Sequence, residues 1–382
     1  MSEGPPRVAV IGSGLAGLTA SWLLTRPAEE GGDAAPPPAR VELYESAPSL
    51  GMGTHSVEMP AVGAAQKKVF VDIPPRFVVP SYYTELLALY ETIGIPFYQS
   101  SGDGCCQDLR AKADAGGAAL QPYFRFGNVR AFGLSLPYVA LGRWSGMVQL
   151  RIIRDLLRFR WRARTQLSSG SLTGMTFGEY LDANYSADFA DRYAVPVLCV
   201  VCTCSPAAVR AYPADTLVEY WLCWALRGEG LRRADGGTKE VVERLSAGLS
   251  ACHLATRVTA LRGGRNGDPW LVKDDKGNTR EFDHVILATQ AKHAAELVAE
   301  YREAEDGAAA DARLRRLGEA VGAVRSEAGE MVLCVTSISI PANRIGIRVT
   351  LRKWVTDCCV VRLSAGTATS RQCRSSVAAG RP

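Results

Sequence analysis

The order of apolar and polar residues at the start of the chain predicts a strand, a glycine turn and a helix. Residues 7–11 form a short β-branched run, which is typical of a buried parallel strand. Residues 18–24 follow as a helical stretch, and residues 40–45 have the pattern of a second strand. A loop rich in proline, glycine and alanine separates that strand from the helix. This alternation predicts an α/β fold with a parallel sheet.

Further along the chain the pattern changes to helices and then returns to strands. From about residue 80 to residue 232 the segments are mostly helical, and beyond Gly236-Gly237 strand patterns recur, including a hairpin of residues 270–274 and 279–283. We therefore predict one discontinuous domain, an inserted and mainly helical substrate domain, and a separate tail. The discontinuous domain comprises residues 1–80 and 233–332, the inserted domain comprises residues 81–232, and the tail comprises residues 333–382.

The turn after the first strand has the sequence Gly-x-Gly-x-x-Gly, a dinucleotide-binding fingerprint when it stands between a strand and a helix. Gly12 permits the tight turn, Gly14 lets the backbone approach a pyrophosphate, and Gly17 lets the helix pack close to the strand. The helix would direct its N-terminal amides and positive dipole end at the phosphates. The predicted contacts of this turn are Gly12, Ser13, Gly14, Leu15, Ala16 and Gly17.

The second strand ends in an acid, which suits the sugar of the same ligand. Glu45 is placed to accept hydrogen bonds from a ribose diol. A carboxylate at this position disfavours a 2′-phosphate, which argues against NADP.

The segments after Glu45 resemble those of FAD-binding proteins of the glutathione-reductase type. Gly51, Gly53 and Thr54 resemble the Glu-x5-Gly-Gly continuation of these proteins, although Met52 stands where the second glycine is usual. Residues 251–258 resemble the strand whose valine, here Val258, contacts the adenine. Residues 283–289 resemble the strand that ends in Ala-Thr beside the flavin, which points to Thr289.

Taken in order from about residue 7 to residue 332, these segments resemble the flavin-containing amine oxidase-like FAD/NAD(P)-binding oxidoreductases, in particular a poorly characterised branch. The resemblance implies a Rossmann-like FAD/NAD(P)-binding domain with an inserted substrate domain, bound FAD, and oxidation of a small molecule such as an amine or a lipid-like compound. It implies a charged group near the flavin, for which Arg76 is the candidate, and it identifies no catalytic residue. Two alternatives stay open, a catalytically silent dinucleotide-binding protein and an NAD-dependent dehydrogenase.

The last part of the chain departs from this pattern. The family closes its cofactor site with a C-terminal Gly-Asp or Gly-Glu pair and a helix, and we find no such segment. From Leu333 onward there are eight Lys or Arg against one acid, Asp357. We expect a disordered or non-native tail, since composition and pattern change together near residues 331–332; a natural tail for targeting or for anionic surfaces is the alternative.

Composition limits the classes of binding partner and the cellular compartments that we expect for this protein. The net charge of +5 comes from the tail, so the body is near neutral and has no basic patch interleaved with aromatics, which argues against nucleic acid. Eleven cysteines without a signal peptide indicate reduced thiols. We therefore expect a protein of the cytoplasm, with an organelle stroma as the alternative. The oligomeric state is not determined by the sequence.

Two features of the middle segment carry further hypotheses. Residues 136–166 form a basic amphipathic stretch, which either packs its apolar face on the domain, the favoured interpretation, or makes peripheral contact with an anionic membrane. Cys199, Cys202 and Cys204 have a spacing that allows a metal site, but matching further ligands are missing and the segment is apolar. We therefore expect buried free thiols and no metal.

Overall fold

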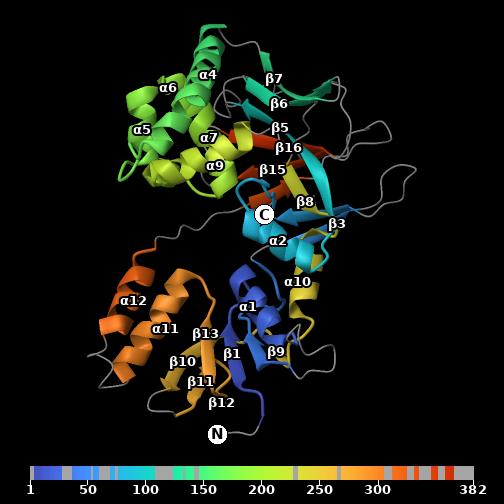
Figure 1. The fold of residues 1–382 in the computed structure, drawn as a ribbon, viewed down its shortest axis with the longest axis vertical. Helices are drawn as coiled ribbons and strands as arrows, with labels where there is room; N and C mark the ends of the chain where they lie inside the picture. The colour runs from blue at the N-terminus through green and yellow to red at the C-terminus, as the bar shows by residue number, and fades with distance from the viewer. Residues whose placement is uncertain are drawn as a thin grey trace, which may run out of the picture. The chain divides into compact units, whose positions relative to one another are not determined.

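The structure is a computed structural model, and its chain divides into two units by internal contacts (Figure 1). Unit 1 comprises Met1–Ser56, Ile93–Ile95 and Gly236–Ser326, and unit 2 comprises Val57–Thr92, Pro96–Asp235 and Glu327–Pro382. The structure describes residues 4–27, 37–52, 55–59, 69–73, 76–107, 124–131, 134–141, 146–226, 231–264, 268–304, 312–324, 331–334, 346–351 and 358–364.

The division differs from the predicted boundaries in several stretches: residues 93–95 belong to unit 1, and residues 327–382 belong to unit 2. Residues 57–80, which the sequence predicts in the cofactor domain, belong to unit 2. One reason is a pair of buried charges within unit 2: Asp72 lies 3.8 Å from the guanidinium of Arg233, and each side chain is 4% exposed. The other predicted boundary, between residues 232 and 233, lies close to the observed change of unit after Asp235.

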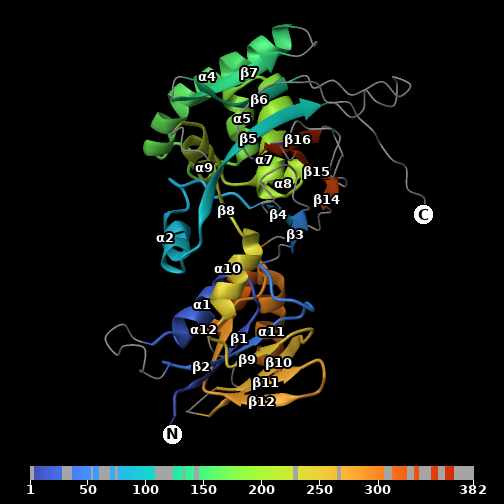
Figure 2. The same cartoon turned by 90° about the vertical axis from the view of Figure 1, so that its right-hand side faces the viewer.

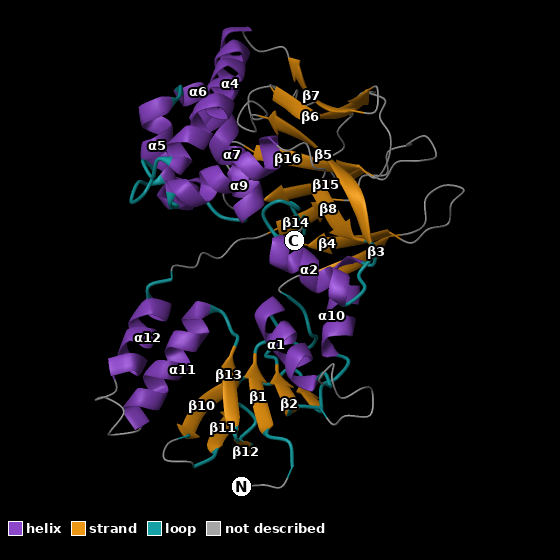
Figure 3. Ribbon diagram, viewed as in Figure 1, coloured by secondary structure: helices purple, strands orange, loops and turns teal. Residues whose placement is uncertain are grey.

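Unit 1 is built on a parallel four-stranded sheet (Figure 3). Its strands lie in the order β13 (His284–Leu287), β1 (Arg7–Ile11), β2 (Arg40–Tyr44) and β9 (Ala251–His253). β1 is central and buried after its first residue, as its β-branched sequence predicts. The register pairs Ile11 with both Tyr44 and Leu287, so three strands end at the same edge of the sheet. The α/β fold is therefore confirmed.

An antiparallel sheet and four helices complete unit 1 (Figure 2). The sheet consists of β10 (Val258–Gly263), β11 (Trp270–Asp274) and β12 (Thr279–Phe282), which confirms the predicted hairpin. Asp274 fixes its turn by accepting hydrogen bonds from the amides of Lys276 and Asn278. The helices are α1 (Leu15–Thr25), α10 (Gly237–Ser246), α11 (Ala291–Ala304) and α12 (Ala312–Gly322).

With the exception of α2, the described helices of unit 2 contribute to an aromatic core. The helices of this unit are α2 (Thr84–Thr92), α4 (Gly146–Ser168), α5 (Phe177–Asn184), α6 (Ala187–Phe189), a π-helical turn (Ala190–Ala194), α7 (Val195–Cys202), α8 (Pro206–Ala211) and α9 (Ala214–Leu226). Trp221 of α9 is 1% exposed and stacks on Phe189, with Phe159 of α4 at 4.7 Å between ring centroids. Among the described residues, none of the helices has the length and apolar character needed to cross a membrane.

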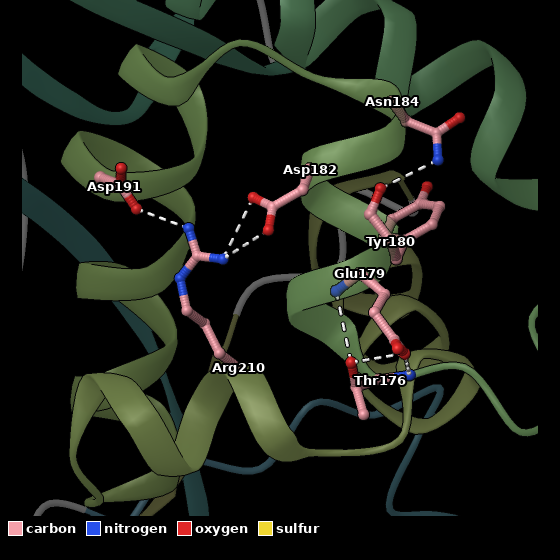
Figure 4. A network of polar contacts seen from close by, with 7 residues as sticks. All are labelled: Thr176, Glu179, Tyr180, Asp182, Asn184, Asp191 and Arg210. Carbon is pink, nitrogen blue, oxygen red and sulfur yellow. Dashed lines mark hydrogen bonds and ion pairs between the residues drawn. The ribbon is translucent and has the colours of Figure 1, made fainter.

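Polar contacts fix the ends of the short helices in this unit. Figure 4 shows the capping box of α5, in which Thr176 and Glu179 each bind the backbone amide of the other. In the same view the guanidinium of Arg210 on α8 reaches Asp182 and Asp191, at 3.1 and 2.7 Å. These ion pairs join α8 to α5 and to the π-helical turn.

Unit 2 also contains strands that the sequence did not predict. A seven-stranded sheet has the order β14-β15-β16-β5-β6-β7, with β8 paired to β5, and β3 pairs with β4 in a separate sheet. These strands are β3 (His55–Met59), β4 (Val69–Ile73), β5 (Phe97–Gln107), β6 (Phe124–Ala131), β7 (Leu134–Leu141), β8 (Leu231–Ala234), β14 (Met331–Cys334), β15 (Gly346–Leu351) and β16 (Cys358–Ser364).

The seven-stranded sheet takes strands from two regions in which the sequence did not predict them. The segment 81–232 is helical from Gly146 to Leu226 but carries β5, β6 and β7 before that point. The tail contributes β15 and β16, and β16 pairs with β5; the disordered or non-native character of the tail stays a prediction. The physical reason is that the paired strands, such as β5 and β16, are far apart in the sequence, so no local pattern predicts their pairing.

Replacing Trp221 by alanine tests the aromatic core. We expect Trp221→Ala to lower the free energy of unfolding by about 3–5 kcal/mol, because the cavity left among four aromatic rings cannot collapse. The measurement is denaturant unfolding followed by circular dichroism. Trp161→Ala is the matched control, since Trp161 is 81% exposed and its loss should change stability by no more than about 0.5 kcal/mol. Equal effects of the two substitutions would contradict this description of the core.

Candidate functional site

The ends of the parallel strands in unit 1 are held together by backbone hydrogen bonds. The amide of Gly12 donates to Tyr44 at 2.8 Å, that of Ala288 to Ile11 at 2.9 Å, and that of Glu45 to His253 at 2.9 Å. The residues that follow β1, β2 and β13 therefore lie side by side. Ligands of open α/β sheets bind at this edge, outside the carboxyl ends of the strands.

Two glycines of the fingerprint are required by the fold itself. Gly12 has φ of 107°, and a Cβ there would lie 2.6 Å from the carbonyl oxygen of Ala288. A Cβ on Gly17 would overlap the carbonyl oxygen of Gly12 and lie 3.1 Å from the Cβ of Ala288. The absence of side chains at Gly12 and Gly17 thus lets α1 and the end of β13 meet the turn at backbone distance.

Gly14 is different, because nothing in the fold excludes a side chain there. Its backbone is extended, with φ of −65° and ψ of 171°, and the nearest atom to a built Cβ is the carbonyl oxygen of Ala288 at 3.7 Å. Among the described residues, the fold therefore leaves room for a Cβ at Gly14, at the N-terminal end of α1. The first turn of α1 contains no acidic residue, so the positive end of the helix dipole is available to an anion.

Glu45 is bonded directly to this turn. Its Oε2 accepts hydrogen bonds from the amide of Ser13 at 3.0 Å and from the Ser13 hydroxyl at 2.5 Å. Its Oε1 accepts from the amide of Ala47 at 2.8 Å and from the Ser46 hydroxyl at 3.3 Å. The Ser13 hydroxyl also accepts a hydrogen bond from the amide of Gly51 at 3.2 Å. Ser13 is fully buried, so this network closes the turn against the end of β2.

The network keeps the carboxyl group of Glu45 ionised. Burial raises the pKa of Glu45, but the hydrogen bonds from Ser13, Ala47 and Ser46 together outweigh burial, and the pKa lies below its ordinary value. A carboxylate is an acceptor only, which suits a sugar hydroxyl and opposes a second phosphate.

The two predicted contacts that come later in the chain, Val258 and Thr289, differ in their surroundings. The amides of Ala255 and Thr256 donate to the carbonyls of Ala47 and Glu45, so the segment that leads into Val258 runs beside Glu45. The Val258 side chain is 1% exposed and packs in the core, which leaves only its backbone for a ligand. Thr289 is half-buried and follows Ala288 at the edge of the sheet.

The structure brings together some of the predicted residues and leaves others apart. Residues 12–17, Glu45, Gly51, Val258 and Thr289 all belong to unit 1. Gly53 and Thr54 lie outside the described residues, and Arg76 is an exposed residue of unit 2, so their roles stay predictions. The sequence did not single out the Ala288 carbonyl; its place one residue before Thr289 at a strand end was the available signal.

The cysteine hypothesis concerns α7 of unit 2. Cys199, Cys202 and Cys204 are free thiols. A hydrogen bond to Cys204, together with burial, raises the pKa of Cys202, so this thiol stays protonated. Within the described residues, no group of three or more His, Cys, Asp or Glu is arranged to hold a metal ion.

Comparison with known proteins agrees with this geometry. Residues 10–93 match the family of NAD(P)-binding Rossmann-like domains. No curated protein sequence matches the chain. A putrescine oxidase redesigned in its cofactor binding has a similar structure, with a TM-score of 0.53 and 14% identity, over 94% of this chain and 75% of that chain. A protein provisionally assigned as a protoporphyrinogen oxidase, from Exiguobacterium sp. 255-15, has a TM-score of 0.50 and 14% identity, over 95% and 77%.

These likenesses establish the fold. The chain contains a Rossmann-like NAD(P)-binding domain and shares its α/β architecture with the two oxidases. The fold that the sequence resemblance predicts is therefore confirmed.

Gly17→Ala tests the packing of the turn. We expect a loss of about 1–3 kcal/mol in the free energy of unfolding, because the new methyl group overlaps the Gly12 carbonyl. Gly14→Ala is the matched control and should change stability by no more than about 0.5 kcal/mol, since its Cβ has room. Thermal and denaturant unfolding measure both. Equal stability of the two variants would contradict the distinction between these glycines.

The pH dependence of stability tests the bonds of Glu45. At neutral pH we expect Glu45→Gln to lower the free energy of unfolding by about 1–3 kcal/mol, because a donor amide would face the amide of Ser13. Because folding lowers the pKa of Glu45, its contribution is fully present above the ordinary value of about 4.3 and is lost as pH falls through the lower folded value. The difference between wild type and variant should therefore shrink in acid. A constant difference would show that ionised Glu45 does not stabilise the fold.

Proposed function

We propose that unit 1 binds FAD and that the protein is an FAD-dependent oxidoreductase of the amine oxidase or desaturase type. The observation that carries the proposal is the uncrowded backbone of Gly14 at the start of α1, in the turn whose Ser13 is bonded to the ionised carboxylate of Glu45. A diphosphate suits the first feature and a sugar diol suits the second. Together they match the two polar parts of a dinucleotide.

The choice of FAD over NAD depends on the chemistry of the structural relatives. Both are described as oxidases, and among redox dinucleotides the flavin is the one that reacts with dioxygen. NAD remains the second candidate because the matched domain family is described as NAD(P)-binding. The carboxylate of Glu45 disfavours the 2′-phosphate of NADP in either case.

The residues present fit the adenosine and phosphate half of FAD. The backbone of Gly12, Ser13 and Gly14, with Leu15 and Ala16 at the helix start and Gly17 at the packing contact, would hold the diphosphate. Glu45 already accepts four hydrogen bonds, which fills its lone pairs. A ribose hydroxyl would therefore replace the longest of them, the 3.3 Å bond from exposed Ser46.

The flavin ring supplies the redox chemistry when FAD is bound, and the protein binds, orients and excludes water. Val258, through its backbone, and Gly51, Gly53, Thr54 and Thr289 are the further proposed contacts in unit 1. The proposed substrate is a small amine, in line with the putrescine oxidase likeness, or a lipid-like molecule. A cytoplasmic location stays a prediction.

Cofactor retention tests the proposal. The purified protein should be yellow and should release FAD, not FMN, on denaturation. Gly14→Glu should abolish FAD retention while the fold persists, because the new carboxylate occupies the space proposed for the diphosphate and repels it. Gly322→Glu is the matched control, since Gly322 lies on α12 of the same unit with no atom within 4 Å of a built Cβ. It should retain FAD like the wild type.

Other outcomes separate the alternatives. Colourless protein that cannot be reconstituted with FAD contradicts the proposal, and tight binding of NADH by the same protein favours a dehydrogenase. Bound FAD that no amine, lipid-like compound or NADH reduces favours a silent binding protein. Unchanged FAD retention in Gly14→Glu would exclude the glycine turn as the binding site.

A further inference from the structure

Helix α4 of unit 2 exposes a line of large apolar side chains. Met147 is 61% exposed, Leu150 61%, Leu157 57% and Trp161 81%. Their spacing of three, seven and four residues places them on one face, since a helix turns once in 3.6 residues. We call these four residues the apolar stripe. It extends over about 21 Å at a rise of 1.5 Å per residue, on a helix at the edge of the helical part of unit 2 (Figures 1 and 2).

The opposite face of α4 is fixed in the core, so the exposure of the stripe follows from packing. Ile152, Phe159 and Ala163 are at most 2% exposed. Between them Asp155 is fully buried; it accepts the amide of Ser186 at 2.8 Å and pairs with Arg154 at 2.7 Å. The helix therefore has two apolar faces, of which the core covers one.

Arginines surround the apolar stripe. All six arginines of α4 are exposed, and its single acidic residue is the buried Asp155. Two of the six have ion-pair partners among the described residues, Arg151 with Asp188 and Arg154 with Asp155. The six are Arg151, Arg154, Arg158, Arg160, Arg162 and Arg164. The exposed face of α4 thus combines apolar side chains with a net positive charge.

We propose that the apolar stripe and its arginines form a docking surface for an anionic lipid bilayer. The apolar side chains would enter the interface between headgroups and acyl chains, with α4 parallel to the membrane plane, and the guanidinium groups would bind lipid phosphates. Trp161 lies at the end of the stripe, and tryptophan favours the membrane interface because its ring is both apolar and a hydrogen-bond donor.

Charge complementarity selects the bilayer over a second copy of the chain. A symmetric dimer through this face would place the arginines of one α4 against those of the other, which is repulsive. Nucleic acid offers phosphates but leaves four large apolar side chains in water, where exposed contiguous apolar surface is unfavourable. A deformable anionic surface satisfies the charges and the apolar side chains together.

Vesicle binding tests the proposal. The full chain should co-sediment with vesicles of phosphatidylcholine and phosphatidylglycerol at low salt, and less with vesicles of pure phosphatidylcholine. Binding should weaken as salt is added, because the Debye length falls to about 3 Å at 1 M. Trp161 fluorescence should shift to the blue on binding, and Trp161→Phe should remove that part of the shift.

Variants separate the two components of the surface. Leu157→Glu with Trp161→Glu should weaken binding more than about tenfold, because two apolar anchors are lost. Arg160→Ser with Arg164→Ser should weaken it about 25-fold, at about fivefold for each arginine. The matched control is Arg316→Ser with Leu317→Glu on α12 of unit 1, where Leu317 is 46% exposed. The control should bind like the wild type.

Several results would overturn the proposal. The proposal fails if the protein does not bind anionic vesicles at low salt, or if all the α4 variants bind as the wild type does. It also fails if the α12 control loses as much vesicle binding as the α4 variants. Sedimentation that shows a lipid-free dimer abolished by the Leu157 and Trp161 changes would assign the face to a second copy. Binding of RNA in preference to vesicles, lost with the two arginines, would assign it to nucleic acid. FAD content and circular dichroism, measured on each variant, keep these outcomes separate from the cofactor proposal and from unfolding.

Discussion

The close approach of backbone to backbone at the end of β1 is the constraint on which unit 1 depends. Gly12 and Gly17 allow the turn, the first part of α1 and the carbonyl of Ala288 to meet without side chains between them. The same approach orients α1 with its N-terminal end at the sheet edge. The site proposed for a diphosphate is thus placed by the close packing of α1 against the end of β1.

Glu45 joins the sugar end of the proposed site to its phosphate end. Its carboxylate accepts hydrogen bonds from Ser13 of the glycine turn and from the amide of Ala47. Its backbone carbonyl accepts the amide of Thr256, in the segment before Val258. The acid therefore has a structural role in addition to the proposed binding role. This arrangement explains how a carboxylate is held in place and ionised before any ligand arrives, which lowers the cost of ordering on binding.

Unit 2 shows a different use of one helix. The core holds α4 through its buried side chains and through Asp155, while the opposite face offers apolar groups and arginines to the surroundings. Such a face is unusual for a helix that packs on a core, because its outer side is normally polar. The glycine turn proposed for the dinucleotide and the face of α4 proposed for an anionic surface thus lie on separate units of the chain.

The sequence by itself determined the parts that depend on neighbours along the chain. The strand-turn-helix unit around Gly12, Gly14 and Gly17, and the hairpin of β11 and β12, follow from local periodicity and turn chemistry, and the structure has them as predicted. Tertiary structure alone decided what depends on distant partners. The pairing of β5 with β16 joins segments that no local pattern connects. The bond of Glu45 to Ser13 and the exposure of Leu157 and Trp161 also depend on which elements pack together, because burial is set by the folded neighbours and not by the residue.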